Sequence, residues 1–218
     1  RPALRPHPSA PVAAAPISRT PAGRGVVLML ASESPRRREL LRGLCPEFRV
    51  LPSGIPEDPP AGDARAAAVA LALAKARAVA GRVPDALVLG ADTVVVVDGD
   101  RLGKPADADE ARRVLRRLRG RAHDVITGVA VVDARTGREA STAVVSRVLM
   151  ADYSDAVIEA YVTSGAPLDK AGAYAIQDLG GALVSAVVGS YTNVIGLPLG
   201  ATRRLLEGFG VGVRPGPA

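Results

Sequence analysis

The longest apolar stretch of the sequence, residues 86–97, places the strongest constraint on the fold. Its sequence is ALVLGADTVVVV, and Gly90 and Asp92 interrupt it. It is shorter than the roughly 18 to 20 residues that a membrane-spanning helix needs, so it indicates a soluble protein. We predict a buried strand over residues 87–97, followed by a hairpin turn at residues 98–100, which read Asp-Gly-Asp.

Strand-like and helix-like stretches alternate along the remainder of the chain. The further predicted strands cover residues 26–31, 48–51, 124–132, 142–149, 173–177 and 183–188. The predicted helices cover residues 35–44, 63–81, 107 or 109 to 120, and 154–163, and a last helix begins near Pro198. Because at least two junctions between strands have the turn residues of hairpins, we expect a mixed sheet rather than a purely parallel one.

The formal net charge of +6 raises the question of nucleic-acid binding. Residues 1–24 hold four arginines and no acidic residue, so the rest of the chain carries only +2 of that charge. A nucleic-acid-binding domain usually has a basic stripe on its folded part, often with aromatic side chains that stack on bases. Aromatic residues make up only 3% of this chain, and we therefore expect no nucleic-acid partner. Because the apolar runs are short, we also expect no membrane partner.

The two ends of the chain differ in composition from its middle. Residues 1–24 are rich in Pro, Ala and Arg and have no hydrophobic period, so we expect a disordered tail. Its acid-free composition is compatible with a transit peptide or with an over-long gene start. We predict one folded domain over residues 25–210 and a second short tail over residues 211–218.

One cysteine and two histidines limit the redox and metal chemistry that the chain can perform. Cys45 cannot form an internal disulfide, which fits a reducing, cytoplasmic compartment, and its position favours a buried structural thiol. Two histidines are too few for a histidine-based metal site, and we expect His123 to lie at a strand edge.

The start of the first predicted helix breaks a rule of helix electrostatics. Ser34 is a good N-cap residue and Pro35 fits the first helical position. Arginines 36, 37 and 38 then fill the first turn, where each opposes the helix dipole by about 0.3–1 kcal/mol. An anion bound at this turn would remove the conflict. The alternative is a solvated basic face that Glu39 partly compensates.

An acidic residue also interrupts the predicted strand over residues 87–97. A buried Asp92 would be costly unless it were paired or bound to a metal, whereas the alternative is an exposed acid at a bulge beside Gly90. Glu57 follows the second predicted strand and could supply another oxygen ligand. Hard oxygen ligands suit Mg²⁺ or Mn²⁺, which also bind phosphates.

Only three of the 28 basic residues are lysines: Lys75, Lys104 and Lys170. A lysine offers a compact point charge where arginine offers a wide planar fork, so a tight phosphate site could need it. Lys104 precedes a proline-restricted turn and is a candidate phosphate contact. Residues 168–177 alternate polar and small side chains, which favours an edge strand beside a cleft, where Gln177 could read a base edge.

Several segments, taken in order, carry a resemblance to a known family. They are residues 30–41, 90–99, 103–105, 126–131, 168–177 and 189–199, and they span about residues 26–210. The chain resembles the Maf-type nucleotide pyrophosphatases, also called septum formation inhibitor proteins. The resemblance implies an α/β, two-lobed Maf/ITPase-like fold with an elongated mixed sheet flanked by helices, and a deep cleft. It also implies a divalent metal cation, Mg²⁺ or Mn²⁺, and makes a homodimer possible.

The resemblance implies roles for particular residues. Asp92 matches the key carboxylate, as general base or metal ligand, and Glu57 matches a second acid that is catalytic and metal-binding. Lys104 matches a catalytic position. The implied substrate-binding residues are Ser32, Arg36, Arg37, Lys75, Thr93, Lys170 and Gln177.

One branch of the family hydrolyses dTTP and UTP to the monophosphate and pyrophosphate. The chain resembles this branch at three positions, which hold Arg36, Thr93 and Gln177. Asp178 departs from the glycine usual at its position. The chain is therefore expected to be a hydrolase acting on an acid anhydride of nucleoside triphosphates, in house-cleaning of the nucleotide pool. The alternatives are a 7-methyl-GTP pyrophosphatase, and a non-catalytic regulator of cell division that acts through a protein partner.

Overall fold

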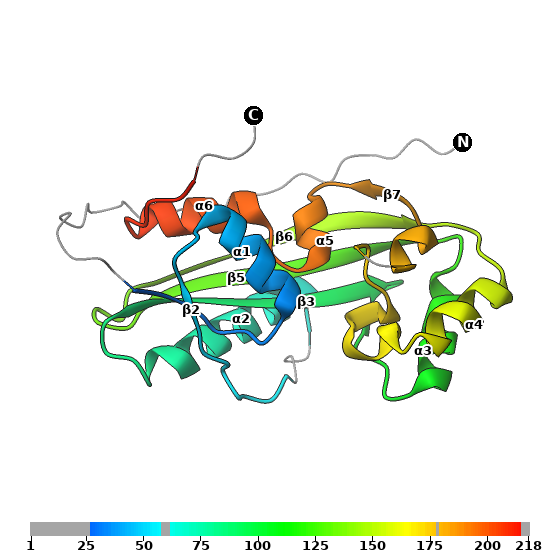
Figure 1. Ribbon diagram of the computed structural model, residues 1–218, viewed down its shortest axis with the longest axis horizontal. Helices are drawn as coiled ribbons and strands as arrows, with labels where there is room; N and C mark the ends of the chain where they lie inside the picture. Colours follow the sequence, from blue (N-terminus) through cyan, green and yellow to red (C-terminus); the bar gives the residue numbers. More distant parts are fainter. Residues whose placement is uncertain (1–26, 58–61, 178, 215–218) are drawn as a thin grey trace.

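Two long antiparallel strands, β3 (Ala86–Val97) and β5 (Ala122–Asp133), run along the centre of the molecule (Figure 1). The computed structural model describes residues 27–57, 62–177 and 179–214. The other strands are β1 (Val27–Leu30), β2 (Arg49–Val50), β4 (Asp100–Leu102), β6 (Glu139–Met150) and β7 (Val184–Val188). Among the described residues they form one sheet of order β2-β1-β3-β5-β6-β7, with β4 also paired to β3. Since β1 is parallel to both of its neighbours and the other pairs are antiparallel, the prediction of a mixed sheet is confirmed.

Helices flank the sheet on both faces (Figure 1). They are α1 (Pro35–Leu44), α2 (Ala64–Ala80), α3 (Ala108–Leu118), α4 (Asp155–Thr163), α5 (Tyr191–Ile195) and α6 (Leu199–Gly208). The first four begin at side chains that accept a hydrogen bond from the backbone N–H three residues later, namely Ser34, Asp63, Asp107 and Ser154. Such caps satisfy the free amide groups of a helix start, so these boundaries follow from local sequence. Among the described helices, none combines the length and the apolar character needed to cross a membrane.

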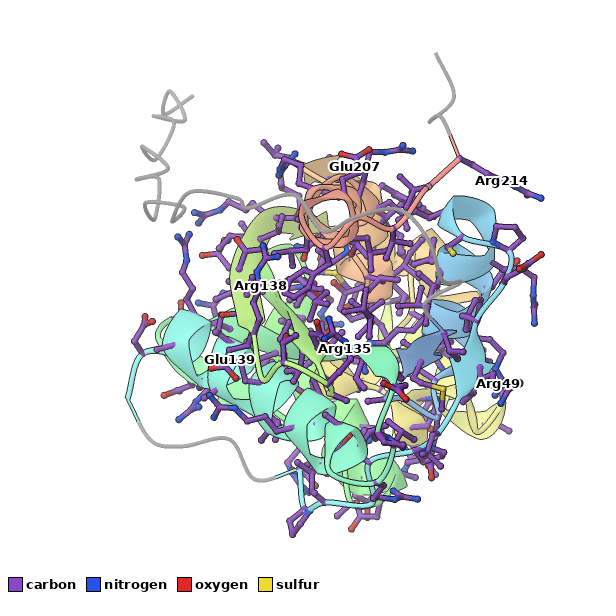
Figure 2. All side chains as sticks on the ribbon, turned by 90° about the vertical axis from the view of Figure 1, so that its left-hand side faces the viewer. Arg49, Arg135, Arg138, Glu139, Glu207 and Arg214 are labelled. Carbon is purple, nitrogen blue, oxygen red and sulfur yellow. The ribbon has the colours of Figure 1, made fainter. Side chains whose placement is uncertain are left out.

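One lobe is built on the two faces of the first half of β3. Leu87, Leu89 and Ala91 point toward α1 and α6, while Ala86 and Val88 point toward α2. Seen along the sheet, side chains fill the space between α2 and α6, and charged groups such as Glu207 and Arg214 lie at the periphery (Figure 2). The lobe therefore has two apolar layers, one on each face of the sheet.

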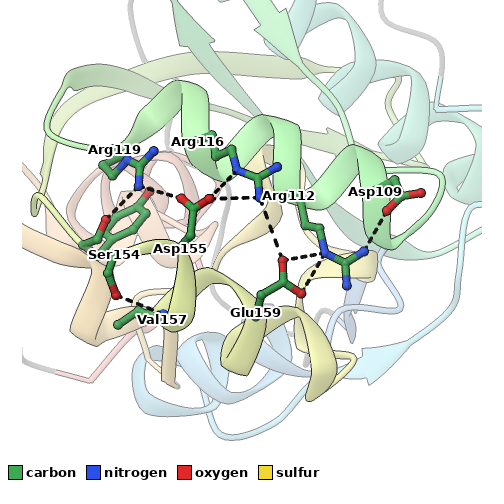
Figure 3. Close-up of polar contacts among 9 residues, drawn as sticks. Asp109, Arg112, Arg116, Arg119, Ser154, Asp155, Val157 and Glu159 are labelled. Atoms are coloured by element: carbon green, nitrogen blue, oxygen red, sulfur yellow. Dashed lines mark hydrogen bonds and ion pairs between the residues drawn. The ribbon is translucent and has the colours of Figure 1, made fainter.

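The second lobe is built on the far half of the same sheet. Its core joins Val95 and Val97 of β3 with Leu115 of α3 and Ile158 of α4, all of them buried. Ion pairs link the two helices on their outer side (Figure 3). They are Arg112–Glu159 at 2.8 Å, Arg116–Asp155 at 3.2 Å and Arg119–Asp155 at 2.8 Å. Because these groups are partly exposed, they align α4 with α3 more than they stabilise the fold.

Two glycines let α2 lie directly on the sheet. A Cβ atom on Gly90 of β3 would overlap the carbonyl oxygen of Ala72, and one on Gly128 of β5 would overlap that of Ala68. Asp92 lies opposite Gly128 in the register. The glycines therefore bring the backbone of α2 against the part of β3 that carries Asp92.

The edge of β3 opens between the two lobes. β1 pairs with β3 as far as Leu89, and β4 pairs with it from Val95 onward. Residues 90–94 therefore pair with β5 on one side only. Successive side chains of a strand point to opposite faces, so Asp92 and Thr93 lie on different faces of the sheet. Both can reach this opening because the edge of β3 is unpaired there.

The predicted strand over residues 173–177 is wrong. Residues 166–169 and 171–173 form short 3₁₀ turns, residues 174–177 form a loop and a turn, and Gly172 and Ala173 both have positive φ. The alternation of small and polar residues imitated the two-residue period of a strand. The sequence also gave no sign of α5, which has only five residues.

The remaining local predictions have mixed outcomes. Cys45 is buried and free, as predicted. His123 is fully buried near the start of β5. The tail over residues 1–24 lies outside the described residues. Within residues 211–218, the described part packs on the core through Val211 and Val213, and the Arg214 amide donates to the Leu44 carbonyl at 2.9 Å.

Candidate active site

A cavity of about 440 Å³ lies at the open edge of β3. Its walls come from the start of α1, the loop after β2, α2, β3, the loop after β4, residues 169–177 and the end of α5. All ten site residues predicted from the sequence line it: Ser32, Arg36, Arg37, Glu57, Lys75, Asp92, Thr93, Lys104, Lys170 and Gln177. Residues that lie far apart in the chain are thus brought together, while the role of each remains a prediction.

Alternating charges form a chain across the floor of the cavity. Lys75 Nζ donates to Glu57 Oε1 at 2.6 Å and to Asp92 Oδ1 at 2.9 Å. Lys104 Nζ donates to the other oxygen of Glu57 at 2.6 Å. Lys75 and Asp92 are buried, with exposures of 3% and 7%. Burial is tolerated because each charge faces an opposite one. Asp92 is therefore a buried acid paired with Lys75 of α2, and it is not an exposed acid at a bulge.

The Glu57 carboxylate is strongly acidic in this setting. Burial raises its pKa, but the hydrogen bonds from Lys104 and Lys75 outweigh that effect and lower it to about 2. Glu57 is therefore ionised at neutral pH and keeps its negative charge beside Lys75.

The donor set of the cavity limits how it could hold a metal. Among the described residues, no group of three or more His, Cys, Asp or Glu side chains is placed to hold an ion. Asp92 and Glu57 are two hard carboxylate donors, and the ammonium of Lys75 bridges them. Mg²⁺ often binds through one or two carboxylates together with substrate phosphates. The residues therefore fit a divalent cation whose coordination phosphate oxygens would complete.

Arg37 is fixed on three sides. Its Nε donates to the Gly196 carbonyl at 2.9 Å, and its terminal nitrogens donate to Ser32 Oγ at 3.4 Å and to Thr93 Oγ1 at 3.0 Å. Burial lowers the pKa of Arg37, and the charges of Asp92 and Glu57 oppose that effect. The guanidinium is thus held in one orientation at the cavity wall.

A chain of hydroxyl groups supports Arg37 from behind. Thr127 Oγ1 donates to the Asn193 carbonyl at 3.0 Å, and Thr93 Oγ1 lies 3.0 Å from Thr127 Oγ1. Since Thr127 has used its only proton, Thr93 donates to Thr127 and accepts from Arg37. Asn193 is itself buried and donates to the Val125 carbonyl and to Ser146 Oγ.

The first turn of α1 faces the same cavity. Ser34 caps the helix by accepting from the Arg37 amide, and Arg36 lies 3.7 Å from Asp169. Lys170 Nζ donates to Asp169 at 2.6 Å. Arginines 36 and 37 therefore converge with the lysines on one space, which is the arrangement that an anion at this turn requires.

Sequence reasoning missed four residues of this arrangement. Asp169 and Tyr174 line the cavity, and Thr127 and Asn193 support it from beneath. A buried Asn or Thr gives no periodic signal, because its partners come from other strands and helices. All four lie in segments that carried the family resemblance, which was the one available signal.

Fold and site together define a class of protein. An α/β chain with a cleft lined by five basic and four acidic side chains, among them the ion-paired Glu57 and Asp92, is suited to a phosphorylated small molecule. The chain belongs to the Maf-like protein family, whose sequence profile matches residues 27–209.

Relatives with a stated activity match most of the chain. It is 48% identical over 187 residues to the dTTP/UTP pyrophosphatase of Pelotomaculum thermopropionicum, covering 85% of this chain and 98% of that protein. It is 54% identical over 195 residues to that of Moorella thermoacetica, covering 85% and 96%. It is 53% identical over 187 residues to that of Myxococcus xanthus, covering 85% and 93%.

Proposed function

We propose that this protein hydrolyses dTTP and UTP to the nucleoside monophosphate and pyrophosphate, and so removes unwanted nucleotides from the pool. The observation that carries the proposal is the chain Lys104–Glu57–Lys75–Asp92, which places two carboxylates and two lysines in one cavity with Arg36 and Arg37. The relatives named dTTP/UTP pyrophosphatase support the choice of substrate.

The proposed reaction is an attack of water on the α-phosphorus. The oxygen of water forms a bond to this phosphorus, the bond to the α–β bridging oxygen breaks, and pyrophosphate leaves. Asp92 accepts the proton of the attacking water, as a general base in the same cavity. Arg36, Arg37 and Lys104 neutralise the negative charge that develops on the leaving pyrophosphate.

A divalent cation fits this proposal in one place. Asp92 and Glu57 would hold Mg²⁺ or Mn²⁺ together with the phosphates, where the ion neutralises phosphate charge and polarises oxygen atoms. Lys75 keeps the two carboxylates together before the nucleotide arrives. We also propose a cytoplasmic location, which the free Cys45 supports.

We assign base selection to the part of the cavity wall that carries Gln177. Gln177 is exposed and lines the cavity, so its amide can pair with a base edge. Thr93 contributes by holding Arg37 rather than by reading the base. Asp178 lies outside the described residues.

The test is product analysis of wild type and the Asp92→Asn variant with Mg²⁺ or Mn²⁺. Substrates are dTTP, UTP, CTP, 7-methyl-GTP and the purine triphosphates. We expect pyrophosphate and monophosphate from dTTP and UTP, lost in the variant by a factor of at least about 10². Preference for 7-methyl-GTP would move the protein to the other enzymatic alternative. No turnover by folded protein would favour a non-catalytic role in cell division.

A further inference from the structure

The wall that carries Gln177 has a strained backbone. We call residues 171–177 the wall segment. Its Gly172 and Ala173 have φ of 72° and 61°, and Ala173 is one of only two non-glycine residues at positive φ in the described chain. The other, Asp98, lies in a hairpin turn where that conformation is common. Strain of this kind persists only where surrounding contacts enforce it, and it gathers at functional sites.

Three hydrogen bonds enforce the shape of the wall segment. The Gly172 amide donates to the Gly103 carbonyl at 3.1 Å, beside Lys104. The Ala175 amide donates to the Tyr161 hydroxyl at 3.2 Å. The Tyr174 hydroxyl lies 2.7 Å from His123 Nε2, with the two rings at 84° to each other. Two of these contacts are made by side chains that do not line the cavity, Tyr161 and His123.

His123 is an unusual residue for a buried apolar core. Its exposure is 2%, and its Nδ1 has no hydrogen-bond partner among the described residues. Burial, aided by Arg147, lowers the pKa of His123 to about 4, and burial raises the pKa of Tyr174, so both are neutral at pH 7. Within the described residues, Nε2 is the one hydrogen-bond partner found for the Tyr174 hydroxyl. An apolar residue would avoid the unpaired nitrogen but would leave that hydroxyl unsatisfied.

We propose that His123 is a positioning residue for nucleobase recognition. Through its hydrogen bond with the Tyr174 hydroxyl, it fixes the wall segment in its strained shape and so holds Gln177 in place at the cavity for a pyrimidine base. His123 itself does not line the cavity, so it acts through Tyr174, which does. The inference rests on the proposed pyrimidine triphosphatase activity, and it adds a residue to the machinery of selection.

Three variants and one control separate positioning from packing. His123→Leu puts an apolar side chain in the buried position and removes the hydrogen-bonding nitrogen, and Tyr174→Phe removes the hydroxyl. His123→Gln restores an acceptor. The control is Tyr153→Phe, which removes a neighbouring buried hydroxyl that donates to the Leu115 carbonyl at 2.8 Å and does not line the cavity.

For His123→Leu and Tyr174→Phe we expect KM for dTTP to rise by about tenfold, which corresponds to the loss of one hydrogen bond, while kcat changes by less than about threefold. The preference for dTTP over dGTP should fall by a similar factor. His123→Gln should retain most of the preference. A double variant that combines His123→Leu with Tyr174→Phe should be no worse than Tyr174→Phe alone. Tyr153→Phe should leave both parameters unchanged. Wild-type KM and preference in folded His123→Leu, or an equal loss in Tyr153→Phe, would overturn the proposal.

A second measurement does not depend on turnover. Amide hydrogen exchange of the nucleotide-free protein should become faster across residues 173–177 in His123→Leu, relative to Tyr153→Phe. Unchanged exchange there would refute the positioning role, whatever the activity. A wild-type protein that hydrolyses no nucleotide would instead refute the proposed function.

Discussion

At the scale of single residues, Lys75 holds the site together electrostatically. It is buried between Glu57 and Asp92, which would otherwise face each other as two carboxylates, with Glu57 keeping its hydrogen bond from Lys104. The sequence singled out Lys75 because lysine is rare in this chain, and the resemblance marked it as substrate-binding. Its contacts with both acids could not be predicted, since they depend on how α2 lies on the sheet.

Replacing Lys75 by methionine should therefore destabilise the protein. Removal of one partner from a buried ionic group costs about 3–5 kcal/mol, and urea unfolding at pH 7 would measure it. The matched change Lys104→Met, at a largely exposed end of the same chain of charges, should cost less than about 1 kcal/mol. An equal loss of unfolding free energy in the two variants would contradict the view that Lys75 stabilises the buried carboxylates more than Lys104 does.

His123 should make stability depend on pH. Because its pKa is lowered to about 4 in the folded protein, the unfolded chain binds more protons between about pH 6.5 and pH 4. Stability should therefore fall as pH decreases through that window, by an amount on the order of 3 kcal/mol from this residue. In His123→Leu, the slope of unfolding free energy against pH should be shallower there, and parallel slopes would contradict the account.

At the scale of helices and strands, predictions succeeded where the signal was local. Ser34, Asp63 and Ser154 marked the starts of α1, α2 and α4, because a cap needs only its own first turn. The strand predicted within the wall segment was wrong because contacts with Gly103, Tyr161 and His123 override the local pattern. No sequence pattern contains those distant partners.

The contact of α2 with the sheet depends on two glycines. Gly90→Ala or Gly128→Ala should cost about 1–3 kcal/mol or more, because the added methyl overlaps a helix carbonyl, and should lower activity by moving Lys75. The control is Gly43→Ala in α1, where nothing lies within 4 Å and the change should stabilise by up to about 1 kcal/mol. Thermal unfolding and dTTP turnover would measure both effects. Neutral behaviour of the Gly90 and Gly128 variants would argue against close packing of α2.

At the scale of the whole molecule, one sheet carries two lobes, and the cavity lies where their strands part. The order of strands leaves residues 90–94 of β3 open between β1 and β4. Hairpin signals predicted the mixed sheet, but composition and periodicity could not predict this opening, because it arises from pairing between distant strands. The family resemblance supplied the ten cavity residues together, and the structure supplied their hydrogen bonds and ion pairs.

The most direct test of the central claim is the position of bond cleavage. Hydrolysis of dTTP in ¹⁸O-labelled water, followed by mass spectrometry, reports which phosphorus the water attacks. We predict label in dTMP and none in pyrophosphate, with turnover lost in Asp92→Asn. Label in pyrophosphate, or release of dTDP and inorganic phosphate, would contradict attack at the α-phosphorus.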